Sequence, residues 1–134
     1  MTRSFLLKLS GEALAASEKD IISPSMLKAY SDEIECATNN KVGVAVVVGG
    51  GNYFRGTSLQ SSGIERVIAD KMGMLATLMN GLALTDFMRQ KGMDVEIYHS
   101  SAIDGVVGPY DRDFAQSRLE AGDVVVLTGG TGNP

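Results

Sequence analysis

Two kinds of hydrophobic pattern alternate along this chain. Short unbroken runs of apolar residues, several of them rich in valine, indicate strands that are buried in a parallel sheet. Longer stretches in which apolar residues recur every three or four positions indicate amphipathic helices. The first pattern predicts strands at 4–9, 42–48, 95–98 and 124–127. The second predicts helices from Ser23-Pro24 to Asn39, from Ile64 to Lys91 and from Asp111 to Ala121.

The predicted elements alternate between strand and helix along the whole chain. Such an order implies right-handed crossovers and a parallel sheet with helices on both faces. We therefore predict an α/β fold in which a mainly parallel sheet is the middle layer of a three-layer α/β/α arrangement. The remaining polar segments at 57–63 and 104–109 are predicted to be loops.

The helix predicted from Ile64 to Lys91 is longer than one small domain needs to cover its sheet. Roughly 28 residues of α-helix extend over about 40 Å. The surplus apolar surface predicts a contact with a second copy of the chain, and therefore a homo-oligomer. Gly73 and Gly81 lie inside this helix, where each costs about 1 kcal/mol relative to alanine. They are therefore predicted to be sites of close packing or of a bend.

Glycine-containing segments follow three of the predicted strands. These segments are Ser10-Gly11, Gly49–Gly51 and Thr128–Gly132. Because the carboxyl ends of parallel strands meet at one edge of a sheet, we expect the three segments to converge there. Bare backbone amides at such a place bind phosphate, and Lys8 and Arg55 beside them add positive charge. The alternatives are a lysine that reaches for water and a solvated arginine next to a tight turn.

The composition is that of an ordinary globular protein and narrows the choice of partners. The 134 residues suit one domain, and 44% of them are hydrophobic. A net charge of −4 without a basic cluster argues against a nucleic acid polymer, although a single mononucleotide remains possible. The absence of a signal peptide and of an apolar run of membrane-spanning length predicts no association with a membrane. Cys36 is the only cysteine, which fits a reducing compartment, and we expect a cytoplasmic protein in which Cys36 is a packing residue.

Familiar phosphate and hydrolase motifs do not match this sequence. The segment Gly51–Thr57 approaches the P-loop pattern but lacks its lysine, and Phe54 stands where the dinucleotide fingerprint needs its last glycine. His99 is the single histidine and has no acid or nucleophile at a fixed spacing, so we expect no catalytic role for it. Phosphoryl transfer without a P-loop remains, a reaction that depends mainly on positioning and charge neutralisation.

Four segments taken together resemble the bacterial UMP kinases (uridylate kinases), which have the amino acid kinase fold. They occur in the order of that family and extend across the whole chain: Lys8–Leu14, Gly49–Gly56, Ala69–Thr77 and Gly130–Pro134. The resemblance implies transfer of the γ-phosphate of ATP to UMP, with Mg²⁺, to give UDP and ADP. It also implies a homo-oligomer, a hexamer in the family. No residue of this chain is assigned to the metal.

The resemblance also assigns roles to individual residues. The phosphates of ATP would be met by Lys8, Ser10, Gly11, Gly51 and Arg55, of which Lys8 and Arg55 are the catalytic candidates. UMP would be bound by Gly50, Asp70, Thr131, Gly132, Asn133 and Pro134. Asp70 would accept hydrogen bonds from the ribose hydroxyls. Sequence spacing alone offers a different role for Asp70, an exposed ion pair with Arg66 one helical turn earlier.

Two departures from the family affect these expectations. Residues 15–20 contain no glycine where the family usually has a glycine-containing segment linked to activation by GTP, which puts regulation by GTP in doubt. The family also continues beyond the position of Pro134 into a half that carries the adenine site. We therefore interpret residues 1–134 as the N-terminal, UMP-binding part of an amino acid kinase-like domain without its C-terminal ATP-binding half, and we expect this chain alone to be inactive.

Two other functions remain open at this point. One is a non-catalytic nucleotide-binding or assembly module on the same fold, which only an assay or further sequence separates from a kinase. The other is a related carbamate or amino-acid kinase. The segments Asp70–Met74 and Gly132–Pro134 favour a UMP kinase over this last alternative.

Overall fold

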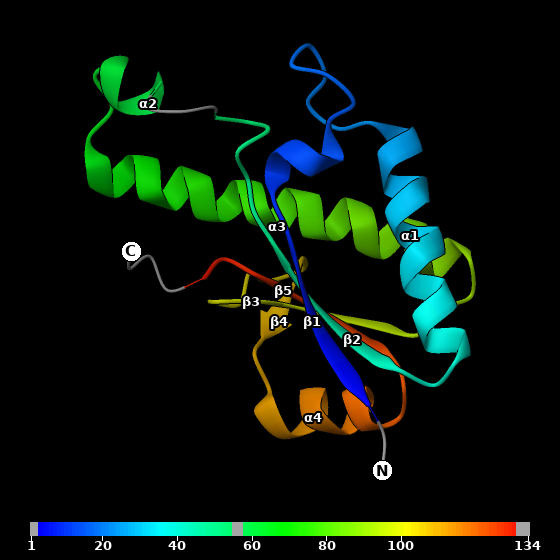
Figure 1. The fold of residues 1–134 in the computed structure, drawn as a ribbon. Helices are drawn as coiled ribbons and strands as arrows, with labels where there is room; N and C mark the ends of the chain where they lie inside the picture. The colour runs from blue at the N-terminus through cyan, green and yellow to red at the C-terminus, as the bar shows by residue number, and fades with distance from the viewer. Residues whose placement is uncertain (1–2, 55–57, 131–134) are drawn as a thin grey trace.

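The computed structural model describes residues 3–54 and 58–130 and has a parallel sheet as its middle layer (Figure 1). The strands are β1 (Ser4–Leu9), β2 (Gly43–Val48), β3 (Val95–His99), β4 (Gly108–Pro109) and β5 (Val124–Thr128). They pair in parallel in the order β1-β2-β5-β3-β4. The predicted parallel sheet is thus confirmed, with β4 as an additional short strand.

Helices cover both faces of this sheet, as predicted for three α/β/α layers. Helices α1 (Pro24–Asn39) and α3 (Arg66–Gln90) lie on one face, and α4 (Arg112–Glu120) lies on the other (Figure 1). Two short elements complete the described chain, the 3₁₀ helix η1 (Gly11–Leu14) and α2 (Ser58–Ser61). Helix α3 begins two residues later and ends one residue earlier than predicted.

Side chains at the helix starts explain two of the boundaries that the sequence predicted. The Ser23 hydroxyl accepts a hydrogen bond from the Met26 amide at 3.4 Å, and Pro24 occupies the first turn of α1. The Asp111 carboxylate accepts one from the Phe114 amide at 3.0 Å at the start of α4. Both satisfy amides that have no partner inside their own helix, which fixes where each helix begins.

The main hydrophobic core lies between the sheet and the pair α1 and α3. Its buried residues include Leu27, Ile34, Val44, Val46, Val48, Leu84, Met88, Val124 and Val126. On the opposite face a smaller cluster of Tyr98, Ala115 and Val125 packs under α4. The expectation that β2 is buried on both faces was wrong, because Ala45 and Val47 are only half-buried. Helix α4 has nine residues and covers only part of its face.

Strand β1 also differs from the buried strand that the sequence predicted. It lies at an edge of the sheet and pairs with β2 alone. Phe5 and Leu6 are 61% and 65% exposed, and Lys8 is exposed as well. An apolar run therefore located the strand correctly but did not indicate its place at the edge.

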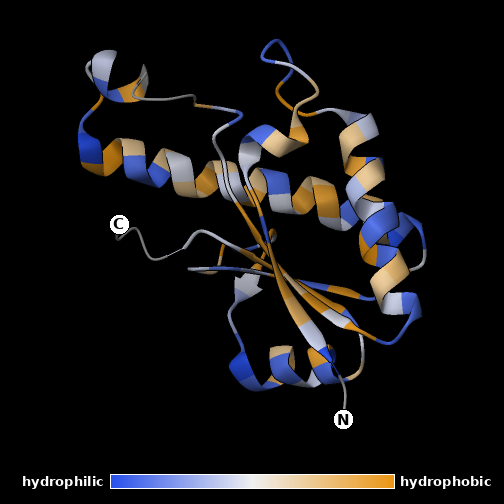
Figure 2. Cartoon of the chain, in the orientation of Figure 1, coloured by the Kyte–Doolittle hydropathy of each residue, from blue (hydrophilic) through white to orange (hydrophobic). Residues whose placement is uncertain are grey.

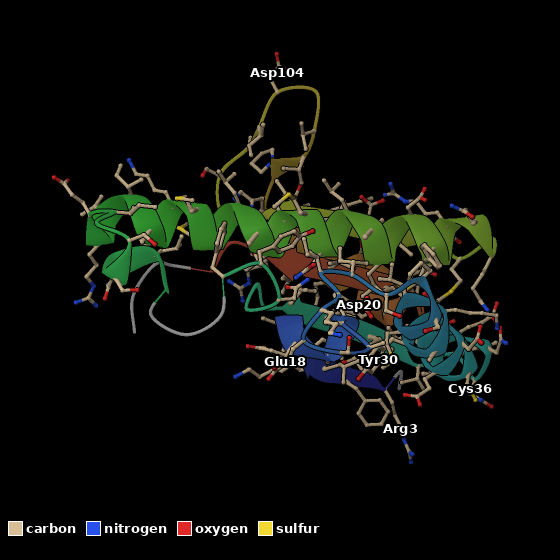
Figure 3. All side chains as sticks on the ribbon, turned by 90° about the horizontal axis from the view of Figure 1, so that it is seen from above. Arg3, Glu18, Asp20, Tyr30, Cys36 and Asp104 are labelled. Atoms are coloured by element: carbon tan, nitrogen blue, oxygen red, sulfur yellow. The ribbon has the colours of Figure 1, made fainter. Side chains whose placement is uncertain are left out.

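Three local expectations need correction. The segment predicted as a loop at 57–63 contains α2, and the one at 104–109 contains β4. Before β4 the chain makes a projecting loop, with Asp104 at its tip, that extends past α3 (Figure 3). Cys36 is exposed on the outer side of α1 and is not a packing residue (Figure 3).

Helix α3 is partly core and partly uncovered. Leu78, Leu84 and Met88 are buried, and the helix contacts α1, β3 and β5. By length and composition alone α3 would be able to cross a membrane, contrary to the sequence analysis, but core helices meet the same criterion. Apolar residues, orange in Figure 2, occur along the strands of the sheet and along much of the length of α3. Four of its apolar side chains are strongly exposed: Val67, Ile68, Leu75 and Met79.

Candidate functional site

The three strands that end in glycine segments are neighbours in the sheet, so their carboxyl ends converge as predicted. The Gly49 amide donates a hydrogen bond of 2.8 Å to the Leu9 carbonyl, which joins the ends of β1 and β2. Gly11 lies directly against the backbone of Gly51, and a Cβ at position 11 would stand 2.8 Å from the carbonyl carbon of Gly50. Real Cβ atoms essentially never come this close to a backbone atom, so only glycine fits here.

Helix α3 holds both of the other glycine turns through polar side chains. The Asn80 amide nitrogen donates to the Gly49 carbonyl at 2.8 Å, and the Gly129 amide donates to the Thr77 hydroxyl at 2.7 Å. Asn80 is fully buried. The sequence analysis missed these two residues. Residues 74–84 are mostly apolar, however, and an asparagine inside such a helical stretch is a sign of a buried side chain that needs hydrogen-bond partners. Turns that are far apart in the sequence are thus fixed to one helix.

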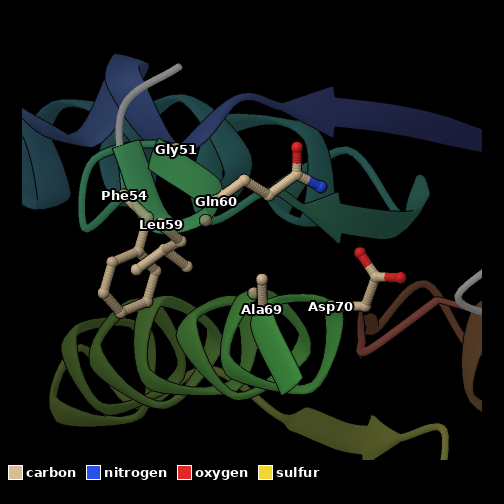
Figure 4. Close-up of a pocket in the computed structure, with 8 residues that line it drawn as sticks. Gly51, Phe54, Leu59, Gln60, Ala69 and Asp70 are labelled. Carbon is tan, nitrogen blue, oxygen red and sulfur yellow. The ribbon is translucent and has the colours of Figure 1, made fainter. Parts of the chain in front are cut away.

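A cleft of about 340 Å³ opens between the turn after β2, helix α2 and the first part of α3 (Figure 4). The Gln60 amide and the Asp70 carboxylate lie on the same side of the cleft, while Phe54 and Leu59 lie together on the other side (Figure 4). The cleft is lined by Gly50, Gly51, Phe54, Leu59, Gln60, Ala69, Asp70 and Gly73. Three of the predicted site residues, Gly50, Gly51 and Asp70, therefore meet in one cavity.

Asp70 is exposed and available to a ligand. In the part of the chain that the structure describes, it forms no ion pair with Arg66, so the alternative suggested by their spacing is not supported. The cleft also brings in Phe54, Leu59 and Gln60, which the sequence analysis did not single out. Gln60 and Asp70 come from different helices, and no sequence spacing would have related them.

Lys8 and Ser10 lie beside the same turn but outside the lining of the cleft. Leu7 and Leu9 pack into the core under α1 and α3, so Lys8 between them faces the other side of the sheet. The Ser10 hydroxyl accepts a hydrogen bond from the Ala13 amide at 3.3 Å and caps η1. The Glu12 carboxylate lies against Gly51. The structure thus separates the predicted ATP residues at β1 from the cleft that holds Asp70.

Several predicted site residues lie outside the described residues. They are Arg55 and the four terminal residues Thr131, Gly132, Asn133 and Pro134. Their roles remain predictions. Across residues 3–54 and 58–130 no group of three or more histidine, cysteine or acidic side chains could hold a metal ion.

His99 supports the turn after β5. Its Nδ1 lies 2.8 Å from the Thr128 hydroxyl, and that hydroxyl donates to the Tyr98 carbonyl at 2.9 Å. Because Thr128 uses its proton on Tyr98, Nδ1 of His99 must be the donor between them. Burial lowers the pKa of His99 and favours this neutral form. Gly129 follows with φ +91°, and a Cβ there would stand 2.8 Å from Cε1 of His99.

A second hollow of about 440 Å³ lies on the α4 face of the sheet. Its lining includes Val47, Leu127, Tyr98 and Tyr110, whose two rings meet edge to face. Among the residues that the structure describes, no acidic, lysine or arginine side chain lines this hollow. The cleft beside Asp70, which offers a carboxylate, an amide side chain and backbone groups, is therefore the better candidate for a polar ligand.

The comparison with protein families agrees with this arrangement. A model of the amino acid kinase family matches residues 3–134. The chain belongs to the amino acid kinase family. Within this family it is similar to the uridylate kinase of Alcanivorax borkumensis, with 50% identity over 129 residues that make up 96% of this chain and 51% of that protein.

Solved structures of the same family give the same result. The UMP kinase from Bacillus anthracis superimposes with a TM-score of 0.91 and 35% identity over 98% of this chain and 55% of that one. The UMP kinase from Ureaplasma parvum has a TM-score of 0.89 and 27% identity, over 100% of this chain and 58% of that one. The predicted amino acid kinase-like fold is thereby confirmed. The chain spans about half the length of these relatives.

Proposed function

We propose that this chain is the UMP-binding, N-terminal part of a UMP kinase, which transfers the γ-phosphate of ATP to UMP and yields UDP and ADP. The observation that carries the proposal is the cleft in which the backbone of Gly50 and Gly51 faces the Asp70 carboxylate. The 50% identity to a uridylate kinase supports the choice of UMP as the acceptor.

In this proposal the two substrates approach the glycine turn from opposite sides. UMP occupies the cleft on the α3 side, where Asp70 accepts hydrogen bonds from the ribose hydroxyls and Gly50 contacts the nucleotide. Thr131, Gly132, Asn133 and Pro134 begin the loop that recognises the uracil end and the phosphate of UMP.

The phosphates of ATP lie over the ends of β1 and β2. Lys8, Arg55 and the amides of Gly11 and Gly51 neutralise charge that develops on the transferred group, and Ser10 lies beside them. Aligning two bound phosphates and offsetting their charge accounts for most of the acceleration of such a transfer.

Mg²⁺ accompanies ATP in this proposal. Magnesium is commonly held by substrate phosphates and water with only one or two carboxylates from the protein. The described residues contain no cluster of metal ligands, so the phosphates would supply most of the coordination. Glu12 is an acidic side chain that lies against Gly51, at the turn where this proposal places those phosphates.

The same proposal includes a homo-oligomer in the cytoplasm, with a second copy packed on α3. Val67, Ile68, Leu75 and Met79 leave an apolar strip about half exposed along that helix, and burying the exposed half of such a side chain is worth roughly 1 kcal/mol. A hexamer, as in the family, would be built from such contacts. Neither a nucleic acid polymer nor a membrane is part of the proposal, and activation by GTP is not included.

The test is a titration of the 134-residue chain with UMP in which binding is monitored by NMR. We expect weak binding that shifts the amide signals of Asp70 and Gly50. Asp70→Asn should weaken binding by about 10- to 100-fold, because hydrogen bonds to a charged group contribute roughly 1.5–3 kcal/mol. The matched control is Asp104→Asn, which removes one negative charge from an exposed loop that does not line the cleft.

A second ligand separates ribose recognition from general electrostatics. 2′,3′-Dideoxy-UMP lacks both hydroxyls, so Asp70→Asn should hardly change its affinity. An equal loss for both nucleotides would show that Asp70 is not the ribose acceptor. A coupled assay of ADP release should find no UMP-dependent turnover with residues 1–134 alone, and turnover near one per second would refute the expectation that these residues do not form a complete ATP site.

A further inference from the structure

Two buried asparagine side chains form a closed pair beneath the glycine turn. Asn52 is 4% exposed and Asn80 is fully buried. The Asn80 amide nitrogen donates to the Asn52 side-chain oxygen at 2.8 Å, and the Asn52 amide nitrogen donates back to the Asn80 oxygen at 3.0 Å. The pair is therefore held by two reciprocal hydrogen bonds away from water.

The remaining proton of each amide reaches a different part of the backbone. Asn80 donates to the Gly49 carbonyl at 2.8 Å, and Asn52 donates to the Ile21 carbonyl at 2.7 Å. All four amide protons of the pair are thus used. The bonds connect three segments: helix α3, the turn 49–52 and the chain just before α1. Buried polar groups that are fully satisfied in this way favour a single arrangement, because a shift of any partner leaves several of them unpaired.

The pair acts on the site through the geometry of α3. Gly50 is pressed against this helix, since a Cβ there would stand 2.8 Å from that of Ala76 and 3.2 Å from the Gly73 carbonyl oxygen. Asp70, Gly73 and Ala76 precede Asn80 at helical spacings of 3, 3 and 4 and share its side of the helix. Ten residues of helix separate the anchor from Asp70 by about 15 Å.

We propose that Asn52 and Asn80 are positioning residues, which fix the glycine turn on α3 and so set the place of the Gly50 and Gly51 backbone relative to Asp70. This inference rests on the proposed function, in which Gly50 and Asp70 contact UMP and Gly51 lies beside the transferred phosphate. Neither asparagine lines the cleft, so the pair acts through the turn and not by direct contact with the ligand.

The test uses Asn80→Asp in the 134-residue chain. In this variant the protonation state of the new carboxyl group decides whether position 80 can still donate a hydrogen bond. An ionised carboxylate has no proton for Gly49 or Asn52, whereas the protonated acid has one, and burial favours the protonated form. At pH 8 we expect UMP to bind about tenfold more weakly than to the original chain. At pH 5.5 this ratio should shrink to about threefold or less, as one donor returns.

The comparison at each pH is made with the unsubstituted chain, so that titration of the UMP phosphate and of Glu12, which lies against Gly51, cancels. Leu84→Val is the control for stability. Leu84 is fully buried in the same helix, and its apolar side chain forms no hydrogen bond to the turn. It should lower the melting temperature while keeping the affinity for UMP and the pH dependence of the unsubstituted chain.

A second readout needs no ligand. The NMR amide signals of Gly49, Gly50 and Gly51 should differ between Asn80→Asp and the unsubstituted chain at pH 8 and approach each other at pH 5.5. If Asn80→Asp does not fold, Asn52→Ser should displace the same signals at both pH values. The inference would be overturned by a folded variant whose glycine signals do not move and whose affinity for UMP stays within about twofold of that of Leu84→Val. If the unsubstituted chain does not bind UMP, only the proposed function is refuted, because the glycine signals test the positioning role without a ligand.

Discussion

The two glycines inside α3 should respond to the same substitution in opposite directions. A Cβ at Gly73 would meet no atom within 4 Å. A Cβ at Gly81 would stand 2.5 Å from Cγ2 of Thr128, 3.2 Å from Cδ1 of Ile97 and 3.3 Å from Cγ1 of Val126. Gly81 is therefore the close-packing site that the sequence allowed for, whereas Gly73 leaves open space beside the cleft.

The magnitudes follow from these surroundings. Replacing glycine by alanine inside a helix contributes about 0.8–1.0 kcal/mol of stability at either position. At Gly81, overpacking costs about 1–3 kcal/mol. Displacing Thr128 also weakens its bonds to His99 and Tyr98, at about 1 kcal/mol. Gly81→Ala should therefore destabilise the chain by about 1–3 kcal/mol, and Gly73→Ala should stabilise it by about 1 kcal/mol.

Urea denaturation, monitored by circular dichroism, gives the free energy of unfolding of both variants and of the unsubstituted chain. The free energies of unfolding should differ by about 2–4 kcal/mol between the variants, which corresponds to roughly 8–16 °C in melting temperature at about 4 °C per kcal/mol. Gly73→Ala should also bind UMP more weakly, because its methyl group enters the cleft wall. A Gly81→Ala chain as stable as Gly73→Ala would refute the close packing of α3 on β5.

Two other expectations concern charged or titrating groups. In an enzyme that carries both halves, Lys8→Ala should lower kcat by about 10²–10³, since one donor to developing phosphate charge contributes roughly 3–4 kcal/mol. Near-normal turnover would instead make Lys8 an ordinary exposed lysine. Burial lowers the pKa of His99 below its usual 6.5, so the unfolded chain binds a proton at a higher pH than the folded one. Stability should therefore decrease as the pH falls below 6.5, and His99→Gln, compared by thermal denaturation between pH 5 and 8, should flatten that decrease.

Local patterns predicted most of the elements because their causes are local. Valine-rich runs indicated β2 and β5, and Ser23 and Asp111 marked helix starts that capping bonds indeed fix. The meeting of the glycine segments also followed from the parallel order. The edge position of β1 did not, because an apolar run carries no information about how many neighbours a strand has.

The support of the site was harder to predict because it is made by contacts between distant residues. Asn52 and Asn80 are 28 positions apart, and only the packing of α3 on the turn brings them together. The cleft wall of Phe54, Leu59 and Gln60 likewise depends on α2, which the sequence analysis took for a loop. The sequence thus indicated the glycine turns and Asp70, but it did not indicate the residues that hold the turns in place.

The position of β5 has a consequence for how the protein is made. This strand joins β2 to β3, yet it is the last strand of the described chain to leave the ribosome. Synthesis at about 5–20 residues per second leaves the earlier strands waiting several seconds for it. Until then β2 and β3 both lack the neighbour that β5 provides, which leaves one edge of each strand open to wrong partners. A chain that ends before Val124 therefore lacks both the strand that joins β2 to β3 and the Gly129 turn that Thr77 of α3 holds.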